Sequence, residues 1–181
     1  MVNVKDIVGQ VLVRLGIDDR YDIDNIPEDD SEIAIIVKCL NMIVSEIASD
    51  YVEVLHTETM QVVNNIIPYE NFSNRLICVK KIILENGLKV NYKLYPTHIK
   101  LDNCSSAEVT YCYLPKELSL KDIVDLPPNI TLLALVFGTL GEYCLINGRY
   151  EDSMIYDKRY REMLRVANRA TKEIKLKARS W

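Results

Sequence analysis

The side chains with the most reactive chemistry in this sequence are two histidines, His56 and His98, and five cysteines. A nucleophilic pair could combine His98 with Cys104 or Cys112, because an imidazole can activate a neighbouring thiol. Nothing in the local sequence supports that pair, and both histidines lie in strand-like segments. The spacing of the cysteines, which lacks any C-x-x-C pair, predicts reduced and mostly buried thiols rather than a zinc site or disulfides. These cysteines are Cys39, Cys78, Cys104, Cys112 and Cys144.

An acidic stretch over residues 18–32 raises the possibility of calcium binding, because Asp22 and Asp24 are spaced as in the start of an EF-hand loop. Pro27 stands where that loop needs glycine, and Ile33 stands where it needs a bidentate glutamate. A solvated acidic loop that stabilises the start of the next helix is the favoured interpretation.

The sequence contains no Walker loop, no dinucleotide-binding glycine pattern, no G-x-S-x-G and no H-E-x-x-H. We therefore expect no enzymatic activity, no catalytic residue, no cofactor and no bound metal. The longest apolar run, near residues 132–137, is too short to cross a bilayer, and the N-terminal residues lack the apolar core of a secretion signal. A membrane partner is not expected.

Charge is divided unevenly along the chain. Residues 158–181 hold nine basic and two acidic side chains, a net +7, while residues 1–157 hold 13 basic and 24 acidic side chains, a net −11. The two parts give the overall −4. Such an asymmetry predicts a basic C-terminal segment that reaches from an acidic body toward a partner.

The elements that would position these residues are helices at both ends of the chain and strands between them. Helical spacing of apolar residues predicts helices over residues 4–15, 31–50 and 130–146, followed by a tyrosine-rich helix from Asp152 to about Ala170. We expect Gly16 to end the first helix, Asn129 to cap the third, and residues 119–124 to form a short helical turn.

Between residues 53 and 114 the pattern alternates every second residue, which predicts a small antiparallel sheet with one wet face. It includes a hairpin around Asn86-Gly87 and strands over 98–101 and 107–113. The expected fold class is α+β: a bundle of about four helices, with a small antiparallel sheet inserted between the N-terminal and C-terminal helix pairs, plus an extended C-terminal tail. The expected parts are residues 1–52 (helical), 53–114 (sheet), 115–171 (helical) and 172–181 (basic tail).

The C-terminal third resembles a known family. Its pattern begins with Leu126-Pro-Pro-Asn-Ile, continues through a helix that ends Gly141-Glu-Tyr-Cys-Leu-Ile-Asn-Gly148, and resumes with Arg149-Tyr-Glu-Asp-Ser-Met-Ile-Tyr-Asp-Lys-Arg-Tyr160. Together with the ending Lys-Leu-Lys-Ala-Arg-Ser-Trp181, this pattern is similar to the head–tail connector (adaptor, or neck) proteins of tailed bacteriophages. The likeness is densest over residues 126–181.

The resemblance implies a structural virion protein that is made in the host cytoplasm and located at the head–tail junction. Such proteins form a homo-oligomeric ring, most often a dodecamer, below the portal protein. They receive a downstream tail protein, and genome DNA passes non-specifically through their channel during ejection.

The resemblance also implies roles for three groups of residues. The expected portal-docking tail comprises Lys172, Ile174, Lys175, Leu176, Lys177, Arg179 and Trp181. The expected turn between the last two helices comprises Gly148, Arg149 and Tyr150. The expected interface with a neighbouring subunit or partner comprises Tyr156, Arg159, Tyr160, Arg161 and Arg165.

A second hypothesis is a nucleic-acid-binding module that uses the basic C-terminal helix and tail, since clustered cations bind phosphates and aromatic rings stack on bases. Against it, the tyrosines fall on the apolar stripe of the helix, and the remainder of the chain is acidic. A solvated helix face would also account for the arginines.

Overall fold

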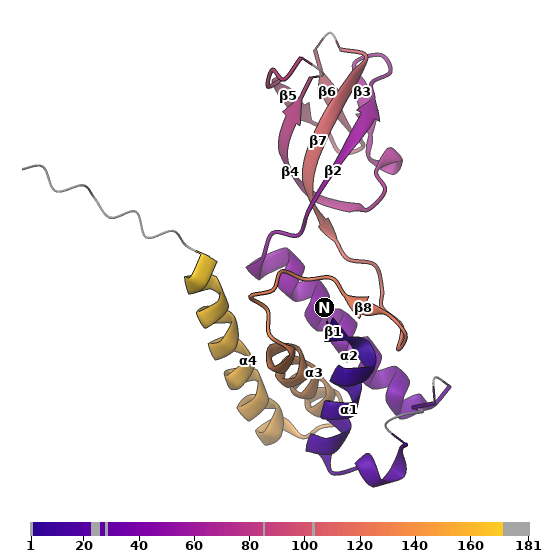
Figure 1. Cartoon of the computed structure of the whole chain (residues 1–181), viewed down its shortest axis with the longest axis vertical. Helices are drawn as coiled ribbons and strands as arrows, with labels where there is room; N and C mark the ends of the chain where they lie inside the picture. The colour runs from indigo at the N-terminus through magenta and orange to yellow at the C-terminus, as the bar shows by residue number, and fades with distance from the viewer. Residues whose placement is uncertain (1, 23–25, 28, 85, 103, 172–181) are drawn as a thin grey trace, which may run out of the picture. The chain divides into compact units, whose positions relative to one another are not determined.

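The computed structural model describes residues 2–22, 26–27, 29–84, 86–102 and 104–171, with side chains described up to residue 168. The chain divides into two compact units (Figure 1). The helical unit consists of residues 1–47 and 117–181, and the strand unit consists of residues 48–116.

The helical unit contains α1 (Val4–Leu15), α2 (Ser31–Glu46), α3 (Leu132–Ile146) and α4 (Tyr150–Thr171). A 3-10 turn (Asp18–Arg20) follows α1, and a π-helical turn (Ile47–Tyr51) continues α2. The predicted bounds of α1 are confirmed, and Gly16 ends it in the left-handed conformation with φ +70°. A carboxylate starts α2, as expected: Asp30 accepts hydrogen bonds from the backbone N–H groups of Glu32 (2.8 Å) and Ile33 (3.2 Å).

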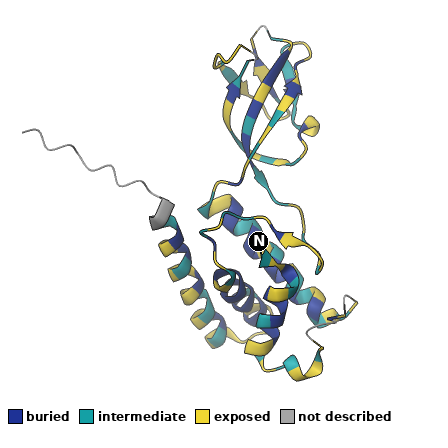
Figure 2. Ribbon diagram, viewed as in Figure 1, coloured by how far each residue is buried: buried dark blue, intermediate teal, exposed yellow. Residues whose placement is uncertain are grey.

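The core of the helical unit is built around α3. An unbroken run on this helix is buried, Ala134 to Gly141, so it has no polar face (Figure 2). It packs against α1, α2 and α4, whose own apolar stripes cover it. Thr131 rather than Asn129 caps α3, because the Thr131 hydroxyl accepts a hydrogen bond from the Ala134 N–H at 3.2 Å; the predicted start at residue 130 is wrong by two residues.

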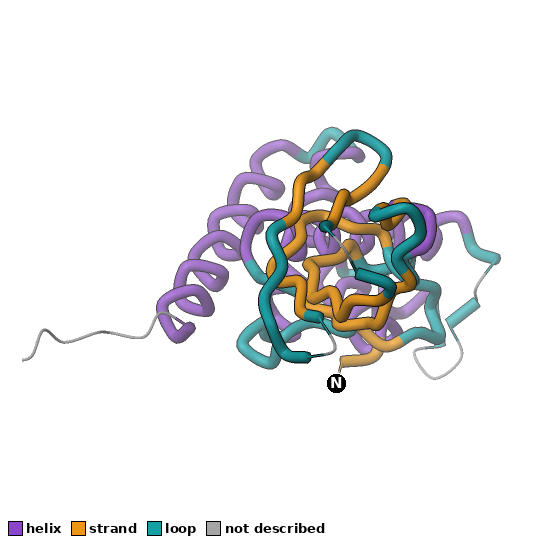
Figure 3. The backbone as a smooth tube through the Cα atoms, turned by 90° about the horizontal axis from the view of Figure 1, so that it is seen from above, coloured by secondary structure: helices purple, strands orange, loops and turns teal. Residues whose placement is uncertain are grey.

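The strand unit has two three-stranded antiparallel sheets, seen as orange tubes in Figure 3. One has the order β2-β7-β4 and the other the order β3-β6-β5. Their bounds are β2 (Leu55–Gln61), β3 (Ile66–Pro68), β4 (Arg75–Ile83), β5 (Tyr92–Leu94), β6 (His98–Leu101) and β7 (Ser106–Leu114).

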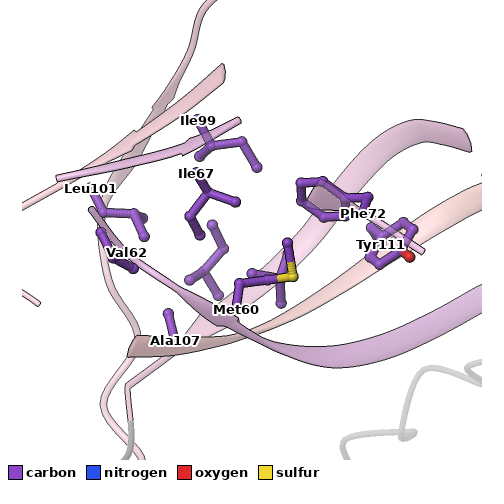
Figure 4. Packing of buried hydrophobic residues seen from close by; sticks show 10 residues of the cluster. Met60, Val62, Ile67, Phe72, Ile99, Leu101, Ala107 and Tyr111 are labelled. Carbon is purple, nitrogen blue, oxygen red and sulfur yellow. The ribbon is translucent and has the colours of Figure 1, made fainter. Parts of the chain in front are cut away.

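The two sheets share one hydrophobic core (Figure 4). Met60 from β2, Ile67 from β3 and Tyr111 from β7 all lie in it. The ring of Phe72 meets that of Tyr111 edge-on, with centroids 4.8 Å apart. The rest of the core consists of Val62, Ile82, Ile99, Leu101, Ala107 and Val109.

The predicted fold, with one small sheet inserted between two helix pairs, is wrong. The described strands form three antiparallel sheets, and the third pairs β1 (Val2–Asn3), which precedes α1, with β8 (Ile123–Val124). Most strands follow α2, but the sheets are not a single insertion between helix pairs, and the chain is of mixed α and β class. The expected helical turn over 119–124 is wrong for the same reason: the β-branched Ile123-Val124 pairs with the N-terminal strand instead.

The predicted hairpin at Asn86-Gly87 is only a short one. Gly87 has φ +79°, and Ile83 pairs with Lys89 in an isolated bridge. Beyond that point β5 leaves β4 and pairs with β6, while β4 pairs along its length with β7. The strands predicted near 98–101 and 107–113 are confirmed as β6 and β7.

A carboxylate links the sheet to the adjoining loop and makes the stability of the strand unit pH-dependent. Glu58 accepts hydrogen bonds from the hydroxyls of Tyr111 (2.6 Å) and Ser73 (2.5 Å). Partial burial acts to raise the pKa of Glu58, but the hydrogen bonds from Ser73 and Tyr111 outweigh it and hold that pKa below its usual 4.5.

Because the folded-state pKa of Glu58 is lowered, its contribution to stability is complete above the unfolded pKa and is lost as the pH falls through the folded pKa. We expect Glu58→Gln to lower the free energy of unfolding at pH 7 by roughly 1–2 kcal/mol, with the difference from the natural protein closing in acid. Chemical denaturation at a series of pH values measures this. Glu70→Gln, on an exposed turn, is the matched control and should leave the profile unchanged; a constant penalty for Glu58→Gln at every pH would contradict the assignment.

Candidate interaction surface

The helical hairpin α3–α4 carries the residues that the sequence singles out. Its turn is closed by backbone hydrogen bonds from Gly148 N–H to the Leu145 carbonyl (3.2 Å) and from Arg149 N–H to the Cys144 carbonyl (2.8 Å). Gly148 has φ +72°, a conformation that glycine adopts without steric cost. The Arg149 guanidinium pairs with Asp152 at 2.7 Å in the first turn of α4, and Tyr150 begins that helix with 65% of its surface exposed.

Small residues let α4 approach α3 closely. The buried Ser153 hydroxyl donates a hydrogen bond to the Gly141 carbonyl at 2.9 Å. A Cβ added at Gly138 would lie 3.1 Å from the Tyr160 ring and 2.9 Å from Ile43 Cγ2. The close approach therefore depends on Gly138, whereas a Cβ at Gly141 would meet its nearest atom at an ordinary 3.5 Å.

An apolar groove of about 650 Å³ lies along the second half of α4. This volume falls in the range of sites that take up small molecules or side chains of a partner. Val166 projects from it with 67% of its surface exposed. Arg159 and Glu162 are the charged residues of its lining, which is completed by Pro128, Asn129, Thr131, Phe137, Met163 and Ala167.

Phe137 forms the floor of this groove between two arginines. The Arg159 guanidinium carbon lies 5.4 Å from the centre of the ring, and that of Arg14, from α1, lies 5.5 Å away. Both distances are within the range of cation–π attraction. Tyr156 stacks beside the same ring at 6.1 Å with an interplanar angle of 20°. Phe137 therefore gives the groove an apolar base, and the Arg159 guanidinium lies over its ring.

A second apolar surface lies at the α3–α4 turn, and we call it the turn patch. Its members, Leu145, Ile146, Tyr150 and Met154, are between 48% and 74% exposed. Leu145 and Met154 line one shallow pocket, and Tyr150 and Met154 are one helical turn apart on α4. Contiguous exposed apolar side chains of this kind mark interaction sites on proteins.

The predicted interface residues are not all on the surface. Tyr160 is only 1% exposed and packs inside the helical unit, so in the isolated subunit it belongs to the core and not to the surface. Arg159 lines the groove and Tyr156 is half-buried beside Phe137. Arg161 is exposed and pairs with Asp157 at 2.8 Å, and Arg165 is exposed.

The predicted docking tail lies outside the described residues. This applies to Lys172, Ile174, Lys175, Leu176, Lys177, Arg179 and Trp181. From residue 158 to its end, α4 carries five basic residues (Lys158, Arg159, Arg161, Arg165 and Arg169) and one acidic residue (Glu162). Four of the seven net positive charges of residues 158–181 therefore belong to the helix.

The sequence did not predict the apolar groove along α4. Phe137 lies on a helix that is apolar all round, so its periodicity does not show which side chain reaches a surface. The one available signal was Val166, an apolar residue that directly follows Arg165 on α4, a helix rich in charged residues.

The described residues contain no group of three or more His, Cys, Asp or Glu side chains that could hold a metal ion. Among the same residues no helix is both long and apolar enough to span a bilayer. No protein-family model matches this chain, and no curated protein matches it significantly.

Proposed function

We propose that this protein is a structural component of a tailed-bacteriophage virion, a head–tail connector whose ring joins the portal vertex to the tail and lets genome DNA pass. The observation that carries the proposal is the α3–α4 hairpin. Its turn sequence resembles that of the connector family, and α4 leads directly into the basic, tryptophan-ended segment.

A ring requires two different complementary surfaces on each subunit, because its contacts run head to tail around the symmetry axis. The helical unit offers two distinct apolar surfaces, the groove and the turn patch, on successive parts of the same hairpin. This arrangement supports assembly into a closed ring, because both apolar surfaces of a subunit would be covered by its neighbours.

The C-terminal segment supplies the contact to the portal protein in this proposal. Ile174 and Leu176 alternate with Lys175 and Lys177, and Trp181 lies at the end of the segment. In this proposal the segment offers apolar anchors to the portal protein, and its cations pair with carboxylates. Burying a tryptophan of ~150–250 Å² at ~25 cal/mol/Å² contributes at most about 4–6 kcal/mol. Ordering the segment costs roughly 1–2 kcal/mol per residue, so a single tail binds weakly and a ring of tails binds strongly through effective concentration.

The test is to measure the mass of the full-length protein alone and with the portal protein from the same genome. We expect a stable complex with several copies of this chain per portal ring. Truncation after Ala170 and the single substitution Trp181→Ala should both abolish it, while Lys89→Ala, which removes one exposed charge in the strand unit, should leave it intact. Unchanged binding by the truncated protein would reject the docking role of the segment.

The alternative, a nucleic-acid-binding module, is favoured by the exposed Lys158 and Arg165 on α4. It predicts binding to DNA of any sequence, with an affinity that falls steeply as the salt concentration rises. The double substitution Lys158→Ala with Arg165→Ala should reduce the slope of log affinity against log salt concentration by about two. The described part of α4 also carries Glu151, Asp152, Asp157 and Glu162, which weakens its attraction for phosphate. Absence of binding at low salt would eliminate this function.

A further inference from the structure

Two cysteines of the strand unit face each other across a strand pair. Cys78 on β4 and Cys112 on β7 are direct partners in the antiparallel register. Partners in such a pair have Cα atoms about 4.5–5.5 Å apart, which lies inside the 4.4–6.8 Å range that a disulfide spans. The register of β4 shifts on both sides of Cys78, between Leu76 and Cys78 and between Val79 and Lys81, so this strand is bulged where the pair forms.

The two thiols interact with each other at one cavity. Burial and a hydrogen bond to Cys78 raise the pKa of Cys112 to about 11. Cys112 is only 4% exposed and Cys78 is half-buried, and both line a cavity of about 240 Å³. Lys80 lines the same cavity, interacts electrostatically with both sulfur atoms, and pairs with Glu53 at 2.6 Å.

We propose that Cys78 and Cys112 form an intrachain disulfide when the protein meets a small disulfide oxidant such as oxidised glutathione. The proposal is independent of the connector function. Register brings the two sulfur atoms together, the cavity gives access to Cys78, and the Lys80 ammonium interacts with both sulfur atoms.

The reaction proceeds by two thiol–disulfide exchanges. The Cys78 thiolate attacks one sulfur of oxidised glutathione, the S–S bond breaks, and one glutathione thiolate leaves. Cys112 then loses its proton to water, and its thiolate attacks the Cys78 sulfur of the mixed disulfide, releasing the second glutathione. Two protein thiols are oxidised and one glutathione disulfide is reduced to two thiols, so no other co-reactant is needed.

The remaining cysteines provide internal comparisons. Cys39 and Cys144 are near enough to influence each other, but both are fully buried in the helical unit, and burial raises the pKa of each thiol. Cys104 is half-buried in the strand unit, and burial raises the pKa of its thiol too. The expected order of reaction is therefore Cys78 with Cys112 first, Cys104 more slowly, and the helical pair only after unfolding.

The test uses the reduced full-length protein, incubated with oxidised glutathione under native conditions, alkylated, digested and mapped by mass spectrometry. We expect a linked pair of peptides carrying Cys78 and Cys112, with a mass lower by two hydrogen atoms than the sum of the reduced peptides. Thermal unfolding of the oxidised protein should shift upward by roughly 4 °C or more, and a dithiol reductant should reverse the shift.

Cys78→Ser should abolish both the linked peptides and the thermal shift, whereas Cys104→Ser should retain them. Full alkylation of Cys78 and Cys112 after oxidation would overturn the proposal, and so would a reaction that stops at a Cys78–glutathione adduct. Because the peptide map of the natural protein decides between these outcomes, the conclusion stands even if the Cys78→Ser variant does not fold.

Discussion

Replacing Tyr160 with alanine is expected to lower the free energy of unfolding by about 3–5 kcal/mol. The side chain is fully buried on α4 and packs over Gly138 of α3, so its removal leaves a cavity that the two helices cannot close without shifting. Chemical denaturation followed by circular dichroism measures the loss.

The matched control is Tyr150→Ala on the same helix. Tyr150 is 65% exposed, and its removal should change the free energy of unfolding by no more than about 0.5 kcal/mol. The two variants also distinguish two roles of Tyr160. If Tyr160 contacted a partner rather than the core, Tyr160→Ala would leave the isolated subunit stable and would weaken only its assembly. Equal effects of the two substitutions on the isolated protein would contradict the burial argument.

Gly138→Ala should destabilise the protein by about 1–2 kcal/mol, although alanine is the better helix former by about 1 kcal/mol. The new methyl would lie 2.9 Å from Cγ2 of Ile43, a buried side chain whose branched Cβ restricts its rotation. The clash cannot be relieved without moving α2 or the Tyr160 ring. The midpoint and slope of denaturant unfolding give the change in free energy.

Gly141→Ala, three residues along the same helix, should have the opposite sign. A Cβ there would meet its nearest atom, the Asp157 backbone nitrogen, at 3.5 Å, which is ordinary contact. The substitution should therefore stabilise by up to about 1 kcal/mol. If both alanines stabilised the protein, the close approach of α2 and α3 at Gly138 would be refuted.

The sequence carried enough information to place elements whose signals are local. The apolar spacing of α1 and its stop at Gly16 required only near neighbours, and so did the alternation in β6. The start of α3 could not be placed, because Asn129 and Thr131 are both good caps and only packing decides between them. The pairing of β1 with β8 joins residues more than a hundred positions apart, and no short-range pattern reports it.

The candidate surface was predictable to a similar extent. The tyrosine stripe of α4 was recognised, but a stripe shows only that one face is apolar, not whether its own subunit or another protein covers it. Burial assigns Tyr160 to the subunit interior and leaves Val166 outside. The Cys78–Cys112 pair was hidden because it depends on the register of β4 against β7, which a bulge in β4 shifts.

Because α3 is buried on all sides, it tolerates fewer substitutions than the helices around it. A helix with no solvent-facing side between Ala134 and Gly141 has no position there that can accept a charge without desolvating it. The outer faces of α1 and α4 are free of that restriction. Related proteins could therefore diverge widely at their outer helices while α3 keeps apolar or small residues, so the slowest-changing segment of such a lineage would be the buried helix rather than its exposed neighbours.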